Sequence, residues 1–83
     1  YLGAVKNWVA LQQRHPGAIY CIVNYHAITG AYDPATLRER TRDMARSVLA
    51  AGIDPGQATL YVQSAVPEHT ELAWIFNTIT PLG

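Results

Sequence analysis

Two short apolar runs, separated by one long amphipathic segment, are the feature that most constrains the fold of this chain. The first run, residues 18–24 (AIYCIVN), is almost continuously apolar and rich in β-branched and aromatic side chains. Such runs are typical of parallel strands that are covered on both faces. The second run, residues 59–63 (TLYVQ), has a similar character. Because strands joined by a helical crossover pair in parallel with a right-handed connection, the sequence predicts a parallel pair.

Helices are expected on either side of the first strand. Apolar residues recur at helical spacing within residues 1–14, and Pro16 with Gly17 ends that segment. The clearest helix begins at Asp33, whose carboxylate can accept hydrogen bonds from the first free N–H groups, and at Pro34, whose ring suits the first helical position. We expect this helix to end at Gly52 in a left-handed cap.

A third helix is expected to begin at Pro67 and to end before Pro81, with one apolar face pointing inward, formed by Leu72, Ile75, Phe76 and Ile79. The resulting order is α-β-α-β-α. Both apolar runs are typical of interior strands with a neighbour on each side. We therefore expect that the first strand of the sheet precedes residue 1 and is missing from this sequence. The fold class predicted is therefore α/β, as part of a Rossmann-like parallel sheet.

The composition excludes several classes of protein. The 83 residues are 49% apolar and 14% charged, which is typical of a globular chain. Six basic and six acidic residues give a net charge of zero, which provides no long-range field for nucleic acid or an anionic membrane. No apolar run approaches the roughly 20 residues that span a bilayer, so no membrane partner is expected. We expect no signal peptide, and the absence of an initiator Met suggests a piece of a longer protein.

The single cysteine, Cys21, cannot form an internal disulfide or a cysteine-based zinc site. Its apolar neighbours indicate a buried position, where a thiol acts as a small hydrophobic group. This cysteine usage favours a reducing, cytoplasmic location.

Few residues carry a recognisable chemical motif. No glycine-rich phosphate loop and no metal-ligand spacing is present. His26 follows the carboxyl end of the first strand, where open α/β sheets place their ligands, so it could contact a ligand or only stabilise a local turn. Ser64 also follows a strand, but no G-x-S-x-G elbow surrounds it, and Gln63 with Ser64 is expected to cap the next helix or to line the rim of a cleft. The arginine-rich run LRERTRDMARS is read as a solvated helix face with ion pairs.

The residues also resemble a known family. The blocks are YLGAVKNWVALQ, CIVNYHAIT, DPATLRERTRDMA, LAAGIDP, TLYVQSAVPEHTELAW and NTITPLG. Together they are similar to the tryptophanyl-tRNA synthetases, which are class I aminoacyl-tRNA synthetases. The resemblance covers essentially the whole chain in order, and HAIT with QSAVPEHTELAW is its most specific part.

This resemblance implies a role for the chain. It places residues 1–83 in a partial Rossmann-type catalytic domain of an enzyme that joins tryptophan to ATP, with Mg²⁺, and transfers the tryptophanyl group to its tRNA. Family members act as homodimers in the cytoplasm or in organelles. The ATP-binding signatures of the family, a glycine-rich stretch before residue 1 and a lysine-rich loop after residue 83, are absent from this sequence, so the isolated chain is expected to be inactive. We assign no catalytic residue, no metal ligand and no motif that binds ATP.

Three residues carry over from the family as substrate-binding candidates. Val23 and His26 match positions that line the tryptophan pocket, where Val23 supplies apolar wall and His26 approaches the amino acid. Gln63 matches a glutamine at the next strand end and is a weaker candidate. Asn24 departs from the family pattern, which usually has Asp, and this departure leaves open any charge network around His26.

Two other classes remain open at this point. The chain could be a non-catalytic α/β module that binds a partner or a small ligand. An NAD-binding oxidoreductase is a third class, and the missing glycine fingerprint argues against it. What precedes Tyr1 in the gene discriminates between a synthetase segment and a module.

Overall fold

The computed structural model describes residues 2–83. Its elements follow the order α-β-α-β-α, with two short 3-10 helices inserted after the strands, as the sequence predicts for the main elements. In chain order they are α1 (Leu2–Arg14), β1 (Ile19–Ile22), η1 (Tyr25–Ile28), α2 (Pro34–Ala50), β2 (Thr59–Val62), η2 (Gln63–Ala65) and α3 (Glu68–Ile79).

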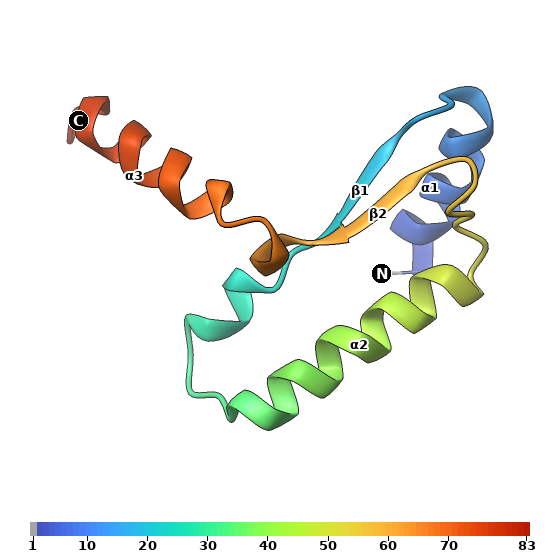
Figure 1. Cartoon of the computed structure of the whole chain (residues 1–83), viewed down its shortest axis with the longest axis horizontal. Coiled ribbons are helices and arrows are strands. Elements are labelled where there is room, and N and C mark those ends of the chain that lie inside the picture. Colours follow the sequence, from blue (N-terminus) through green and yellow to red (C-terminus); the bar gives the residue numbers. More distant parts are fainter. Residues whose placement is uncertain (1) are drawn as a thin grey trace.

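The two strands form one parallel sheet, which confirms the predicted pairing (Figure 1). Tyr20 lies opposite Leu60, and Ile22 lies opposite Val62. Each strand has four residues, so β1 is shorter than the predicted 18–24 because the chain turns into η1 directly after Asn24. The sheet continues no further among the described residues.

Only one face of the sheet is well covered, contrary to the expectation that both would be. Tyr20 packs with Val48, Ile53 and Ala58 in the buried core, and Val48 of α2 is the most deeply buried of these side chains, at 1% exposure. Residues on the opposite face alternate with them along β1, and Ile19 is 70% exposed. The predicted burial on both faces is therefore wrong for this chain by itself.

Helix α1 is attached to this core by one ring stack and three side-chain hydrogen bonds. The Trp8 and Tyr20 rings stack with centroids 5.3 Å apart, and the Tyr20 hydroxyl donates to the Trp8 carbonyl over 2.9 Å. Gln12 is 4% exposed; its Nε2 donates to the Gly52 carbonyl over 2.7 Å and its Oε1 accepts from the Asp54 N–H over 2.9 Å. Gln12 therefore holds α1 against the turn that joins α2 to β2.

Both predicted ends of α2 are confirmed. Asp33 is the N-cap, and its Oδ2 accepts from the Thr36 N–H over 2.8 Å. Pro34 occupies the first helical position. At the other end Gly52 has φ +118°, the left-handed region that favours glycine. A Cβ atom at Gly52 would meet a Val9 methyl at 3.3 Å, so glycine here also allows α1 to approach closely.

Helix α3 departs from the prediction that its apolar face points inward. It projects away from the sheet, and no other helix lies beside it among the described residues (Figure 1). The predicted core residues are all at least half exposed: Leu72, Ile75, Phe76 and Ile79. The radius of gyration is 15.1 Å, whereas a compact chain of this length has about 12 Å. The sequence pattern predicted the helix correctly, but no segment of residues 2–83 covers its apolar face.

Candidate functional site

The carboxyl ends of both strands meet at one edge of the sheet. After Ile22 and Val62, the last paired residues of the ladder, each strand turns into a 3-10 helix, η1 or η2. In open α/β sheets ligands bind at this edge. The predicted site residues Val23, His26 and Gln63 all lie on these two turns or immediately before them.

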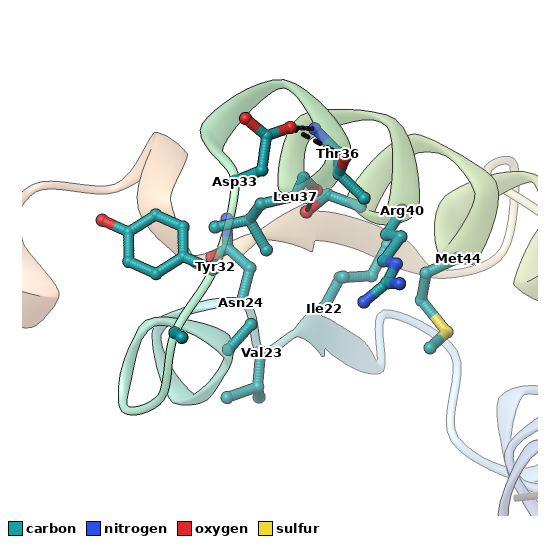
Figure 2. A pocket seen from close by; sticks show the side chains of 12 residues that line it. Ile22, Val23, Asn24, Tyr32, Asp33, Thr36, Leu37, Arg40 and Met44 are labelled. Atoms are coloured by element: carbon teal, nitrogen blue, oxygen red, sulfur yellow. Dashed lines mark hydrogen bonds between the residues drawn. The ribbon is translucent and has the colours of Figure 1, made fainter.

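A cavity of about 430 Å³ opens at this edge, between the end of β1, the loop after η1 and the first half of α2. Figure 2 shows Leu37, Arg40 and Met44 projecting from α2 on the side that faces Ile22. Val23 lines the same cavity and is 52% exposed. The wall is therefore largely apolar, with one guanidinium group at its border.

His26 lies in η1, with an exposed side chain. Its carbonyl accepts from the Thr29 hydroxyl over 2.7 Å and from the Thr29 N–H over 3.3 Å, which closes the turn. No hydrogen bond of the imidazole ring is present within the described range 2–83. The ring is therefore available to a ligand, and its contact with tryptophan stays a prediction.

Gln63 uses its side-chain oxygen inside the protein. Oε1 accepts from the Tyr25 N–H over 3.2 Å, at the start of η1. The amide group of Asn24 makes two further bonds between the strand ends: Nδ2 donates to the Ser64 hydroxyl over 2.8 Å, and Oδ1 accepts from the Ser64 N–H over 3.1 Å. The helix α3 has no side-chain cap, so the capping alternative for Gln63 and Ser64 is wrong, whereas Ser64 lines a cavity beside α2, as the other alternative expected.

This bridge between Asn24 and Ser64 was missed by the sequence reasoning. A signal existed, because two strands of equal length that pair in register bring the residues after them side by side. Ser64 is engaged by Asn24, and no histidine contacts it in the described part of the chain. A nucleophilic role for Ser64 therefore has no structural support.

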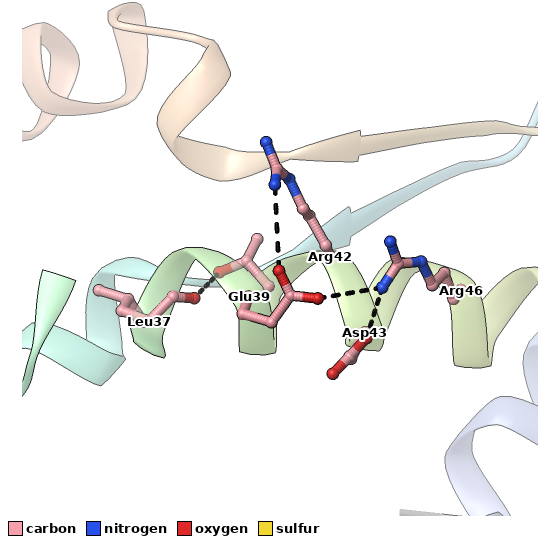
Figure 3. Close-up of polar contacts among 6 residues, drawn as sticks. Leu37, Glu39, Arg42, Asp43 and Arg46 are labelled. Atoms are coloured by element: carbon pink, nitrogen blue, oxygen red, sulfur yellow. Dashed lines mark hydrogen bonds and ion pairs between the residues drawn. The ribbon is translucent and has the colours of Figure 1, made fainter. Parts of the chain in front are cut away.

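The charges of α2 lie on its exposed side, as expected from the sequence. Arg46 pairs with Asp43 over 2.7 Å and with Glu39 over 3.2 Å, and Arg42 lies 3.9 Å from Glu39 (Figure 3). Hydrogen bonding to Asp43, and then to Glu39, raises the pKa of Arg46. At the start of the helix, the backbone N–H of Thr36 and then its hydroxyl hold the pKa of Asp33 below its usual value. These groups stabilise the helix and leave Arg40 facing the cavity.

A second polar contact joins β2 to α3 on the open face of the sheet. The Tyr61 hydroxyl lies 2.8 Å from His69 Nε2, and the two rings stack with centroids 5.7 Å apart. Cys21 lies opposite Tyr61 in the sheet register, and the neighbouring thiol, followed by burial, raises the pKa of Tyr61. The predicted buried, inert position of Cys21 is confirmed only in part, since the thiol is half-buried.

The arrangement offers binding surface more than reactive groups. Among residues 2–83 there is no cluster of three or more side chains that could hold a metal ion. Within the same residues, no helix has the length and apolar character needed to cross a membrane. Of the three predicted site residues, Val23 lines the cavity, whereas His26 and Gln63 are not among its lining residues.

Comparisons with known proteins agree with this architecture. The family model of class I tRNA synthetases (W and Y) matches residues 1–83. The chain is 58% identical over 83 residues to tryptophan–tRNA ligase 2 of Streptomyces avermitilis, covering all of this chain and 24% of the relative. It is 49% identical over 86 residues to the tryptophan–tRNA ligase of Deinococcus radiodurans, covering 26% of that protein.

Solved structures give the same result. A crystal structure of tryptophanyl-tRNA synthetase from Campylobacter jejuni, complexed with ADP and tryptophan, superposes with a TM-score of 0.88 at 37% identity and covers 100% of this chain and 26% of that chain. This chain thus spans about a quarter of the length of the relatives it matches. The Rossmann-like fold expected from the resemblance is confirmed, and the chain belongs to the class I tRNA synthetases of the tryptophan and tyrosine type.

Proposed function

We propose that this chain is a segment of the catalytic domain of a longer tryptophan–tRNA ligase, called the full-length protein below. That enzyme activates tryptophan with ATP and Mg²⁺, transfers it to tRNA, and acts as a cytoplasmic homodimer. The observation that carries the proposal is the match of the whole chain, at 49–58% identity, to relatives that bear this name. A solved relative complexed with ADP and tryptophan supports the choice of ligands.

The part played by these 83 residues is to form one wall of the amino-acid site. Val23 supplies apolar surface to the cavity at the strand ends. His26 lies on η1 with an exposed side chain, and an imidazole ring has nitrogen atoms that can donate or accept a hydrogen bond. We assign His26 to substrate positioning, because no carboxylate contacts its ring among residues 2–83 and Asn24 occupies the nearby position.

The residues present do not by themselves fit a phosphate-binding role. No glycine-rich turn follows either described strand, and Lys6, the only lysine, is exposed on α1. ATP would supply the adenylyl group that activates the amino-acid carboxylate, with pyrophosphate as the leaving group, and residues 2–83 offer no recognisable site for its phosphates.

Pyrophosphate exchange by the full-length protein tests the proposal. Exchange should depend on tryptophan and ATP, and tyrosine at the same concentration should support far less of it. The comparison is needed because the matching family contains enzymes of both specificities. Exchange that prefers tyrosine, or that is absent with every amino acid, would overturn the assignment.

A further inference from the structure

At the edge where the substrate is proposed to bind, side-chain hydrogen bonds take the place of the backbone hydrogen bonds of the sheet. Backbone pairing ends at Ile22 and Val62, so the next N–H groups along the chain need other acceptors. Two of them find amide oxygens on the opposite strand. The Ser64 N–H donates to Asn24 Oδ1 over 3.1 Å, and the Tyr25 N–H donates to Gln63 Oε1 over 3.2 Å. The bonds are reciprocal, because the segment after each strand supplies one backbone donor and one side-chain acceptor.

Asn24 also fixes its own orientation. Its Nδ2 donates to the Ser64 hydroxyl over 2.8 Å, so both ends of the amide are engaged by one residue. Its backbone has φ −105° and ψ −8°, and its carbonyl accepts from the Ala27 N–H over 3.3 Å. Asn24 is therefore the residue at which the strand becomes η1, and it connects η1 to the other strand.

Apart from the bonds made by the side chains of Asn24 and Gln63, no hydrogen bond joins η1 to the sheet among residues 2–83. None of its residues is buried, and its internal bonds determine its shape but not its position on the sheet. The position of His26, two residues after Asn24, therefore depends on the bonds that anchor Asn24 and Tyr25.

We propose that Asn24, Gln63 and Ser64 form a clamp that positions His26 for tryptophan. The proposal rests on the proposed function. It gives Gln63 a role different from the one the family resemblance implies: its oxygen holds the Tyr25 N–H, so it is a positioning residue. It also gives the departure from the family pattern at Asn24 a physical meaning. An aspartate at position 24 would also accept a hydrogen bond from the Ser64 N–H. Its second oxygen would accept a bond from the Ser64 hydroxyl, whereas the Asn24 amide donates to that hydroxyl.

Exchange kinetics in the full-length protein test the clamp. Asn24→Ala removes both bonds to Ser64 and should raise the tryptophan KM about 5- to 30-fold, with a smaller change in kcat. Asn24→Asp should restore KM to within about 2-fold, since a carboxylate can accept both bonds. The matched control is Asn77→Ala, an exposed asparagine on α3. An unchanged KM in Asn24→Ala, or no rescue by aspartate, would overturn the proposal.

A double-mutant cycle with His26→Ala separates positioning from general stability. If Asn24 acts through His26, Asn24→Ala should raise KM by less than about 2-fold in the His26→Ala background. Additive effects would contradict the clamp. If Asn24→Ala does not fold, Ser64→Ala is the alternative, because it removes only the hydroxyl group. It should raise the tryptophan KM about 2- to 5-fold, and this effect should also disappear in the His26→Ala background.

The hydrogen-exchange rate of the Ser64 amide tests the clamp independently of activity. The Ser64 amide should exchange about tenfold or more faster in Asn24→Ala than in Asn77→Ala, because its acceptor is gone. Equal exchange in both variants would refute the clamp. If the wild-type protein shows this protection but does not activate tryptophan, the proposed function fails and the assignment of His26 to tryptophan fails with it, while the clamp itself stands.

Discussion

Gln12 is the polar residue on which the packing of α1 depends most. Its side chain is 4% exposed and makes two hydrogen bonds to the turn after α2, at Gly52 and Asp54. Gln12→Ala removes both bonds and leaves a backbone C=O and an N–H without partners. Each net bond is worth about 1 kcal/mol, and each stranded group costs about 1–3 kcal/mol, less where water can enter. Both partners lie at exposed residues, so we expect a total loss of about 2–4 kcal/mol.

The neighbouring glutamine provides the control. Gln13 is exposed on the same helix, so Gln13→Ala makes the same chemical change and the same change in helix propensity. It should alter stability by no more than about 0.5 kcal/mol. Native-state hydrogen exchange of the Asp54 amide in the full-length protein measures the difference, and a loss of 2–4 kcal/mol raises the exchange rate about 30- to 900-fold. Equal exchange in the two variants would refute the structural role of Gln12.

Three further predictions follow from the exposed edge, the missing ATP-binding groups and the cap of α2. The isolated 83-residue chain should be a dimer, a higher oligomer or partly unfolded, because β1 has a free apolar edge; a compact monomer with one sharp melt in sedimentation and thermal experiments would contradict this. The isolated chain should support no pyrophosphate exchange, and tryptophan-dependent exchange above a no-protein control would refute that. Asp33→Ala should lower the melting temperature of the full-length protein at pH 7. The folded pKa of Asp33 is depressed, so its contribution is present above the ordinary value of about 3.9 and is lost as pH falls through the folded pKa. A deficit that persists undiminished at pH 2 would refute this linkage.

The elements that local chemistry defines were predictable from the sequence. Asp33 with Pro34 and the glycine at position 52 mark the two ends of α2 by capping geometry alone. The parallel pairing followed from the helical crossover between two apolar runs. The helix ends depend on residues near one another in the chain, and the strand pairing, although it joins Ile19 to Thr59, depends only on the order of the elements.

The cover of an apolar face and the side-chain contacts between the strand ends were not predicted. The apolar face of α3 was expected to point inward, yet Ile75 and Ile79 are exposed, because a pattern indicates that a face must be covered and not by which segment. The bond from Gln63 to the Tyr25 N–H connects residues 38 apart in sequence. Family resemblance had given Gln63 to the substrate, and only the register of the sheet reveals its partner in the protein.

The proposed contact of His26 with tryptophan is tested most directly by one variant. In the full-length protein, His26→Ala should lose one hydrogen bond and some packing to tryptophan, worth about 1–3 kcal/mol. The tryptophan KM should then rise about 5- to 150-fold with a smaller change in kcat. His15→Ala, at an exposed histidine in the turn before β1, should leave KM unchanged. An unchanged tryptophan KM in His26→Ala, with a lowered melting temperature, would show that His26 only braces its loop and would contradict the account.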